Sequence, residues 1–233
     1  MSIQQNKIKA IIQKIWSLLP NPQPMSGDDI VDKIDDVYES GKQAEKEDFW
    51  DKFQNNGNRT DYGYGFAGVG WTDENYNPKY PIRVTSTASI YQYSRITITK
   101  QPIIIQTTAA NNSPFYACQF LEEITELVLE TDVSNASSAF SNCSSLQTIR
   151  ITGDGKFLGS LNLRNSSYLT PESIRNFIEA LSPDVSGQTI TFKKSCLKAA
   201  FGIEISSDAE IPTDNDFYTL RQSRRNWVFA YVT

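Results

Sequence analysis

An apolar pattern that recurs at a fixed interval, from Phe115 to Phe140 and equally from Cys118 to Cys143, constrains the fold of this chain more than any other feature. A period of about 20–29 residues with apolar residues at fixed offsets is typical of a solenoid, in which each unit supplies one short strand. Solenoids of this size usually present surfaces for assembly or recognition, so the pattern predicts a binding or structural protein and not an enzyme. The predicted repeat core is Phe115, Cys118, Leu121, Ile124, Phe140, Cys143, Leu146, Ile149 and Ile151.

The overall composition is that of an ordinary globular protein. Of the 233 residues, 39% are hydrophobic and 21% are charged. No run of eighteen apolar residues occurs, so no membrane insertion is expected. Polar residues interrupt the first 19 positions, which argues against a signal peptide and predicts a protein made in the cytoplasm. The net charge of −5 argues against nucleic acid as a partner.

Histidine is absent, which narrows the chemistry that the chain could perform. The commonest general base, the Ser–His and Cys–His nucleophile systems and the commonest zinc ligand are all missing. Hydrolysis by two carboxylates stays open, but the spacing singles out no pair. Two of the three cysteines occupy the repeated core position, so we expect buried free thiols, with a disulfide as the alternative. We predict no catalytic residue, no cofactor and no metal site.

Residues 1–54 are predicted to form a helical arm for attachment or oligomerisation. Apolar residues in the first helix alternate in steps of four and three, and isoleucine at both seam positions favours trimers in parallel coiled coils. Prolines break the helix at 20–24 before a second helix begins near Ser26. The pattern leaves open whether the arm binds copies of itself or another protein. The predicted interface residues are Ile8, Ile11, Ile12, Ile15, Trp16, Leu19, Ile30, Ile34 and Val37.

Residues 55–81 alternate glycine with aromatic residues. Such a segment packs as irregular loops, and we interpret it as a cap on the open end of the solenoid. Stacking of the aromatic rings on a sugar is the alternative. The turn Asp73–Asn75 carries oxygen ligands for calcium but lacks the ligand ladder of an EF-hand.

Residues 82–233 are predicted to form a leucine-rich-repeat-like domain. Thr170 followed by Pro171 predicts the N-cap and first position of a helix, and Gly202 ends a second one that begins at Ser195. A third helix is expected over 216–225. The predicted strands are 96–99, 102–106, 127–129, 149–151, 161–163, 190–192 and, as the closing edge of the sheet, 227–232.

The segment from Ala139 to Ile151 resembles the unit of BspA-like leucine-rich repeats, with the pattern A-F-x-x-C-x-x-L-x-x-I-x-I. The preceding unit is looser, because Glu126 stands where the second strand residue should be apolar, and a shift of register is expected there. The resemblance implies an α+β chain: an N-terminal helical arm followed by a short BspA-like leucine-rich-repeat solenoid.

A second resemblance covers the chain from Val37 to its last residue. The stretches 37–45, 49–51, 57–62, 66–71 and 78–80, and the closing motifs 189–192, 199–202 and 226–227, are similar to phage and prophage structural proteins. Those proteins join an attachment segment to a BspA-like domain. The resemblance implies a tail, baseplate or head-fibre component of a virion, with other virion proteins as partners, and no catalytic residues.

Three functions are therefore open at the level of the sequence. The first is a non-enzymatic virion protein, a homo-oligomer with the trimer favoured, whose arm anchors it and whose repeat domain contacts a host-surface glycan or protein. The second is a bacterial cell-surface adhesin or cell-wall binding module, against which the missing signal peptide counts. The third is a glycan hydrolase that depends on carboxylates.

Overall fold

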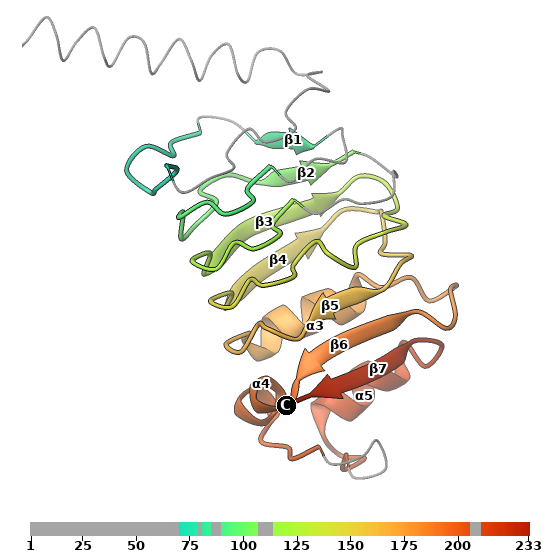
Figure 1. The fold of residues 1–233 in the computed structure, drawn as a ribbon. Helices are drawn as coiled ribbons and strands as arrows, with labels where there is room; N and C mark the ends of the chain where they lie inside the picture. The colour runs from blue at the N-terminus through green and yellow to red at the C-terminus, as the bar shows by residue number, and fades with distance from the viewer. Residues whose placement is uncertain (1–69, 79–80, 85–89, 107–113, 206–210) are drawn as a thin grey trace, which may run out of the picture. The chain divides into compact units, whose positions relative to one another are not determined.

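The structure is a computed structural model, and it describes residues 70–78, 81–84, 90–106, 114–205 and 211–233 (Figure 1). The chain divides into two compact units, Met1–Asn55 and Asn56–Thr233. All of the described residues belong to the second unit. The arm predicted over 1–54, with its interface residues, and most of the segment 55–81 lie outside the described residues.

The second unit is a solenoid whose first wall is a parallel sheet of four strands in the order β1-β2-β3-β4 (Figure 1). The strands are β1 (Ile82–Val84), β2 (Ile103–Ile105), β3 (Glu123–Leu129) and β4 (Thr148–Thr152). Each strand pairs with the strand one turn further along the chain, as Ile103 does with Leu127. Because successive strands are parallel, the chain must return to the same end of the sheet before each new strand begins. Each return takes a similar number of residues, which accounts for the period of the sequence repeat.

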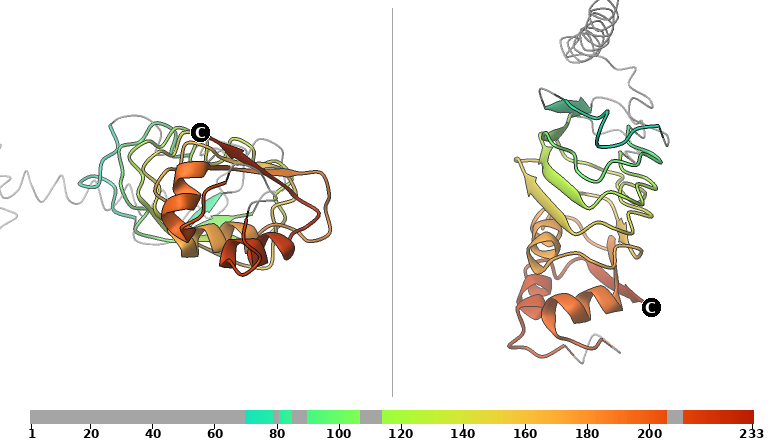
Figure 2. Two further views of the ribbon diagram at one scale, coloured as in Figure 1. Left: turned by 90° about the horizontal axis from the view of Figure 1, so that it is seen from below. Right: turned by 90° about the vertical axis from the view of Figure 1, so that its left-hand side faces the viewer.

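A second parallel sheet, in the order β5-β6-β7, forms another wall in the later turns. Its strands are β5 (Leu161–Leu163), β6 (Thr189–Lys193) and β7 (Val228–Val232), and β7 is its C-terminal edge. The helices α3 (Pro171–Glu179), α4 (Lys194–Phe201) and α5 (Asp216–Gln222) belong to these turns. A view along the stack shows the turns lying over one another (Figure 2).

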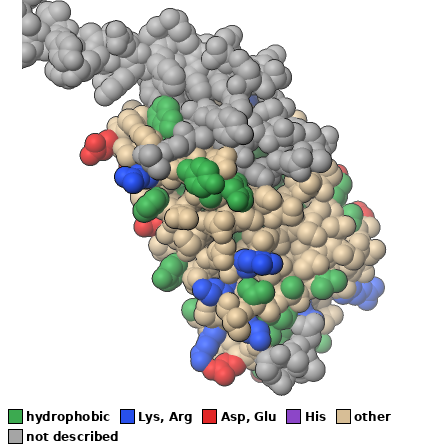
Figure 3. All heavy atoms as spheres, in the orientation of Figure 1, with side chains coloured by type: hydrophobic (Ala, Val, Ile, Leu, Met, Phe, Trp, Pro, Cys, Tyr) green, Lys and Arg blue, Asp and Glu red, His purple; other side chains and the backbone are tan. Residues whose placement is uncertain are grey.

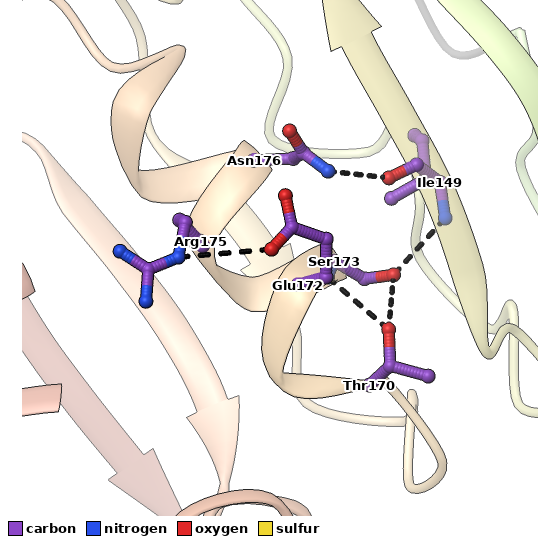
Figure 4. Close-up of polar contacts among 6 residues, drawn as sticks. All are labelled: Ile149, Thr170, Glu172, Ser173, Arg175 and Asn176. Atoms are coloured by element: carbon purple, nitrogen blue, oxygen red, sulfur yellow. Dashed lines mark hydrogen bonds and ion pairs between the residues drawn. The ribbon is translucent and has the colours of Figure 1, made fainter. Parts of the chain in front are cut away.

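Helix α3 lies beside the outer edge of β4, and its side chains supply hydrogen-bond partners for backbone groups there (Figure 4). The Ser173 hydroxyl accepts a hydrogen bond from the backbone N–H of Ile149 at 3.0 Å and donates one to the carbonyl of Gln147 at 2.9 Å. The Asn176 amide donates to the carbonyl of Ile149 at 3.0 Å. An open strand edge carries unpaired backbone groups, so these side chains replace the partners that a further strand would supply.

The interior of the solenoid holds a row of aromatic rings from three successive turns, Tyr91, Phe115 and Phe140. The Tyr91 and Phe115 rings are stacked with centroids 5.5 Å apart, and Phe115 and Phe140 are stacked at 5.6 Å. Tyr76 meets Tyr91 edge-on, and its hydroxyl donates to the carbonyl of Thr99 at 2.8 Å. Rings of this size bury much apolar area, so the row forms the centre of the core.

Most of the expected strands and helices are confirmed. The strands expected over 102–106, 127–129, 149–151, 161–163, 190–192 and 227–232 match β2 to β7, and the N-cap at Thr170 is present. The register shifts between Ile124 and Leu127, next to Glu126. This bulge places one more residue in β3 than in β4 between paired positions.

Three expectations are wrong. Of the segment 96–99, only Ile98 forms a bridge, to Glu123, because the chain turns again at Lys100, whose φ is 54°. The third helix stops at Gln222, where the Ser223 hydroxyl donates to the carbonyl of Leu220. Ile151, expected in the repeat core, is only half-buried, since it lies near the end of β4 beside α3.

Candidate binding surface

Four successive turns of the solenoid share one corner, and their backbones are held in register there. We call the segments 90–97, 114–121, 139–146 and 162–169 the corner turns. Just after them, the N–H of Glu122 donates to the carbonyl of Thr97 at 2.8 Å, Gln147 donates to Glu122 at 2.9 Å, and Thr170 donates to Gln147 at 3.0 Å. Equivalent residues of neighbouring turns therefore lie side by side, at the spacing of about 4.8 Å that hydrogen-bonded strands keep.

The first three corner turns bend at the same place. Tyr93, Ala117 and Asn142 have left-handed φ values of 60°, 58° and 63°. This conformation costs a residue with a Cβ roughly 1–2 kcal/mol, and asparagine tolerates it best. The N–H of Ala117 donates to the carbonyl of Ser141 at 2.8 Å, which ties one bend to the next. The residue that follows each bend, Ser94, Cys118 or Cys143, is buried, so the repeated bend sets the inner side of the corner turns.

The inner side of the corner turns carries a row of thiols and hydroxyls. The Cys118 thiol donates to the carbonyl of Tyr91 at 2.8 Å, and the Cys143 thiol to that of Phe115 at 3.0 Å. In the next turn the Ser166 hydroxyl donates to the carbonyl of Cys143 at 3.0 Å. Burial raises the pKa of the Cys143 thiol to about 12 and raises that of Cys118 well above its ordinary value. These thiols are neutral structural donors, not nucleophiles.

The outer side of the corner turns carries one outward side chain per turn in a single row. The register places Arg95, Phe120, Ser145 and Tyr168 two residues before the paired positions, and we call these four residues the corner row. Phe120 is 51% exposed and Tyr168 is 68% exposed, while the guanidinium of Arg95 lies 5.9 Å from the centre of the Phe120 ring. The row therefore presents a cation, a ring, a half-buried hydroxyl and a second ring.

Further aromatic and polar side chains flank the corner row. The 53%-exposed ring of Tyr93 meets the half-buried ring of Tyr116 edge-on, with centroids 6.4 Å apart. In the third turn the bend carries Asn142, whose side-chain amide is hydrogen-bonded to that of Asn165. Figure 3 shows hydrophobic side chains in separate patches on a described surface that is mainly uncharged and polar. The flanks thus offer both ring faces and hydrogen-bonding groups.

The corner turns themselves carry only positive charge, while the carboxylates of Glu122 and of Asp73, which is hydrogen-bonded to Thr97, adjoin them. The whole chain has a net charge of −5, yet the four corner turns contain no aspartate or glutamate, and the exposed Glu122 follows the second turn. They contain two arginines, Arg95 and Arg164, and both are exposed. Lys193 adds a third cation, because its ammonium group donates to the Ser167 hydroxyl at 3.1 Å. A local positive field of this kind raises the local concentration of anionic ligands.

The residues predicted from the sequence lie on the buried side of the corner, and its exposed side was not predicted. Eight of the nine repeat-core residues are at most 2% exposed, so they hold the corner in place and touch no ligand from outside. The sequence reading missed the turn 90–97, although Tyr91 and Ser94 precede Phe115 and Cys118 by nearly the interval of the repeat and have comparable shapes. It also missed the corner row, whose members have no common residue type.

The acidic turn that begins at Asp73 contacts the first corner turn. The Asp73 carboxylate, part of the turn considered for calcium, accepts from the N–H and the hydroxyl of Thr97 at 2.8 and 2.7 Å, which is a structural use. Over the described residues no group of three or more His, Cys, Asp or Glu side chains gathers in a way that could hold a metal ion. Within the same ranges no helix is both long and apolar enough to span a bilayer.

Comparison with known proteins gives no neighbour for this arrangement. The chain matches no family model, no curated protein and no solved structure.

Proposed function

We propose that this protein is a non-enzymatic structural component of a phage virion, anchored by its N-terminal segment and displaying the solenoid at the particle surface. The observation that carries the proposal is the corner row on a rigid scaffold. A solenoid repeats one backbone shape, so outward side chains of successive turns form a fixed, extended contact surface. Exposed rings on such a surface are typical of proteins that bind a partner.

The finer assignment of the solenoid follows from its repeats. Phe140, Cys143, Leu146 and Ile149 resemble the BspA-like pattern, and all four are buried in the positions that such a repeat assigns to its core. The similarity to phage structural proteins supports a tail, baseplate or head-fibre location with other virion proteins as partners. A bacterial adhesin would use the same surface, so the location of the chain decides between the two.

The experiment that tests this proposal is a mass-spectrometric inventory of phage particles purified by density gradient from the host that carries the gene. We expect this chain in every preparation, in a fixed ratio to the other structural proteins and resistant to washing with high salt. Particles that lack the chain would contradict the proposal. Recovery of the chain from the envelope of cells that produce no particles would favour the adhesin.

The proposed anchoring segment has its own test. Light scattering on a sizing column gives the solution mass of the full chain and of a chain that begins at Asn55. A trimeric full chain beside a monomeric shortened chain would support an oligomerising arm. Two monomers would mean that the apolar residues of 1–54 bind a different virion protein.

A further inference from the structure

We infer that the corner row binds an anionic polysaccharide, with Phe120 and Tyr168 stacking on sugar rings and Arg95 pairing with an acidic group of the polymer. The inference deepens the proposed function and rests on it, since the corner row meets a host-surface polymer only if the particle displays the solenoid. It is carried by three features of the corner: the exposure of the rings, their spacing and the local charge.

The exposure of the rings fits a sugar better than a protein partner. Phe120 and Tyr168 are separated in the row by Ser145, and the neighbouring turns add the amides of Asn142 and Asn165. A stable protein interface buries about 800 Å² on each partner around an apolar centre. Isolated rings between hydroxyl and amide groups lack such a centre. They suit a ligand with apolar C–H faces and many hydroxyl groups.

The spacing of the rings fits a linear ligand. Phe120 and Tyr168 are two turns apart in a row whose register is fixed by backbone hydrogen bonds. With neighbouring strands about 4.8 Å apart, the two rings lie about 10 Å apart along the solenoid. A polymer of sugars in an extended conformation presents one ring after another along a line. It can therefore cover both aromatic side chains at once without bending.

The local charge selects an acidic polymer over a neutral one. Arg95 lies against the Phe120 ring, so a sugar stacked on Phe120 would bring its substituents next to the guanidinium. Arg164 and Lys193 provide further positive charge at the far end of the corner turns. The four turns contain no carboxylate of their own, and the acids that adjoin them include Asp73, which is already held by the N–H and hydroxyl of Thr97, and Glu122. An arginine also pairs with a carboxylate through two parallel hydrogen bonds, which adds geometric selectivity.

The test uses polygalacturonate as the anionic probe and its fully methyl-esterified form as the neutral control, because both have the same sugar rings. Affinity electrophoresis in native gels measures how strongly each polymer retards the full-length protein. We expect retardation by polygalacturonate that weakens at high salt, and at least about tenfold weaker binding to the ester. Equal binding to both polymers, or none to polygalacturonate, would overturn the inference.

The double variant Phe120→Ser and Tyr168→Ser removes both rings without a change of charge. The row already contains a serine at Ser145, so the fold should accept serine at these places, and circular dichroism checks this. We expect binding to fall at least about tenfold, in line with the loss of two ring contacts. Each single variant serves the same purpose if the double variant fails to fold. Unchanged binding by the folded variants would refute the assignment.

The variant Arg95→Gln tests the cation, and Arg225→Gln on the exposed turn after α5 is its control with the same charge change. We expect about threefold weaker binding for Arg95→Gln at low salt and no change for the control. Equal losses in both would mean that only net charge matters and would overturn the pairing with Arg95. Failure of these binding tests beside a positive virion inventory would remove the ligand and leave the proposed location intact.

Discussion

The early and late turns of the solenoid solve the same packing problem in different ways. In the early turns, strands pair at a nearly constant interval, as Ile103 does with Leu127, and the rings of Tyr91, Phe115 and Phe140 lie nearly parallel, at 11° and 19°. In the late turns, Leu161 pairs with Ile190 and Ile190 with Phe229, so the interval is longer and changes from one turn to the next. There the ring of Phe217 meets the rings of Phe192 and Phe229 edge-on.

The difference shows what a strict repeat requires. The rings stack in parallel where successive backbones superpose, and each of these turns places an aromatic residue at the same position. Once a helix occupies part of a turn, the rings approach from new directions, as Phe177 does toward Phe140 at 82°. Edge-to-face contact is as favourable as offset stacking, so the core stays closed while the repeat in the sequence disappears.

The largest expected effect comes from Phe140, the ring at which the two regions meet. It is 1% exposed and contacts both Phe115 and Phe177. We expect Phe140→Ala to lower the free energy of unfolding in urea by about 3–5 kcal/mol, because it leaves a large cavity. Tyr168→Ala, at an exposed ring, should change it by less than about 0.5 kcal/mol. Equal effects of the two substitutions would mean that the rings do not form one continuous core.

Two glycines, one in each region, resist substitution for different reasons. A Cβ on Gly155 would lie 2.3 Å from the carbonyl oxygen of Thr131, because two early turns pack backbone on backbone there. We expect Gly155→Ala to cost about 3 kcal/mol in the free energy of unfolding. At the end of α4, Gly202 has no atom near its missing Cβ but a φ of 68°. Gly202→Ala should cost only about 1 kcal/mol, and the reverse order would contradict the proposed packing.

The junction between sheet and helix is tested at Ser173. Its hydroxyl is the acceptor for the buried N–H of Ile149, so Ser173→Ala leaves that donor unpaired. We expect a loss of about 2 kcal/mol in the free energy of unfolding, within the usual cost of an unsatisfied buried group. Ser195→Ala on the exposed side of α4 is the control and should be close to neutral. A neutral Ser173→Ala would mean that α3 does not terminate the sheet in this way.

The smallest expected effect is a dependence on pH that arises at Cys143, in the early turns. Because burial raises the folded pKa of Cys143 to about 12, the stabilising effect of the neutral thiol is complete below the ordinary thiol pKa of 9.0 and is lost as the pH rises toward 12. One such thiol lowers the free energy of unfolding by about 1.4 kcal/mol per pH unit in that range. Urea denaturation at pH 8 and pH 10 should therefore show a shallower decrease for Cys143→Ala than for the natural chain. Equal decreases would contradict a buried thiol.

The early turns were predictable from the sequence because equivalent positions in successive turns hold the same residue type. Phe115 and Phe140, like Cys118 and Cys143, are identical residues at equivalent places, so their interval is visible without a structure. The turn before them was not predicted, because Tyr91 stands at the position of the phenylalanines and a serine at the position of the cysteines. Helix α3 was predictable from Thr170 and the proline that follows, a local signal that needs no knowledge of the fold.

The corner row could not be predicted in the same way. Outward positions of a repeat are free to vary, so Arg95, Phe120, Ser145 and Tyr168 share no residue type. They form a row only after the backbone hydrogen bonds of the corner turns set the register. The left-handed bend at Ala117, three residues before Phe120, also has no signature in the sequence.

The central claim is that a virion displays the corner of this solenoid to its surroundings. Its most direct test is electron microscopy of intact purified particles with a gold-labelled antibody raised against the full-length protein. The account predicts label at one defined structure on every particle. Unlabelled particles, together with label on the surface of cells that produce none, would contradict it.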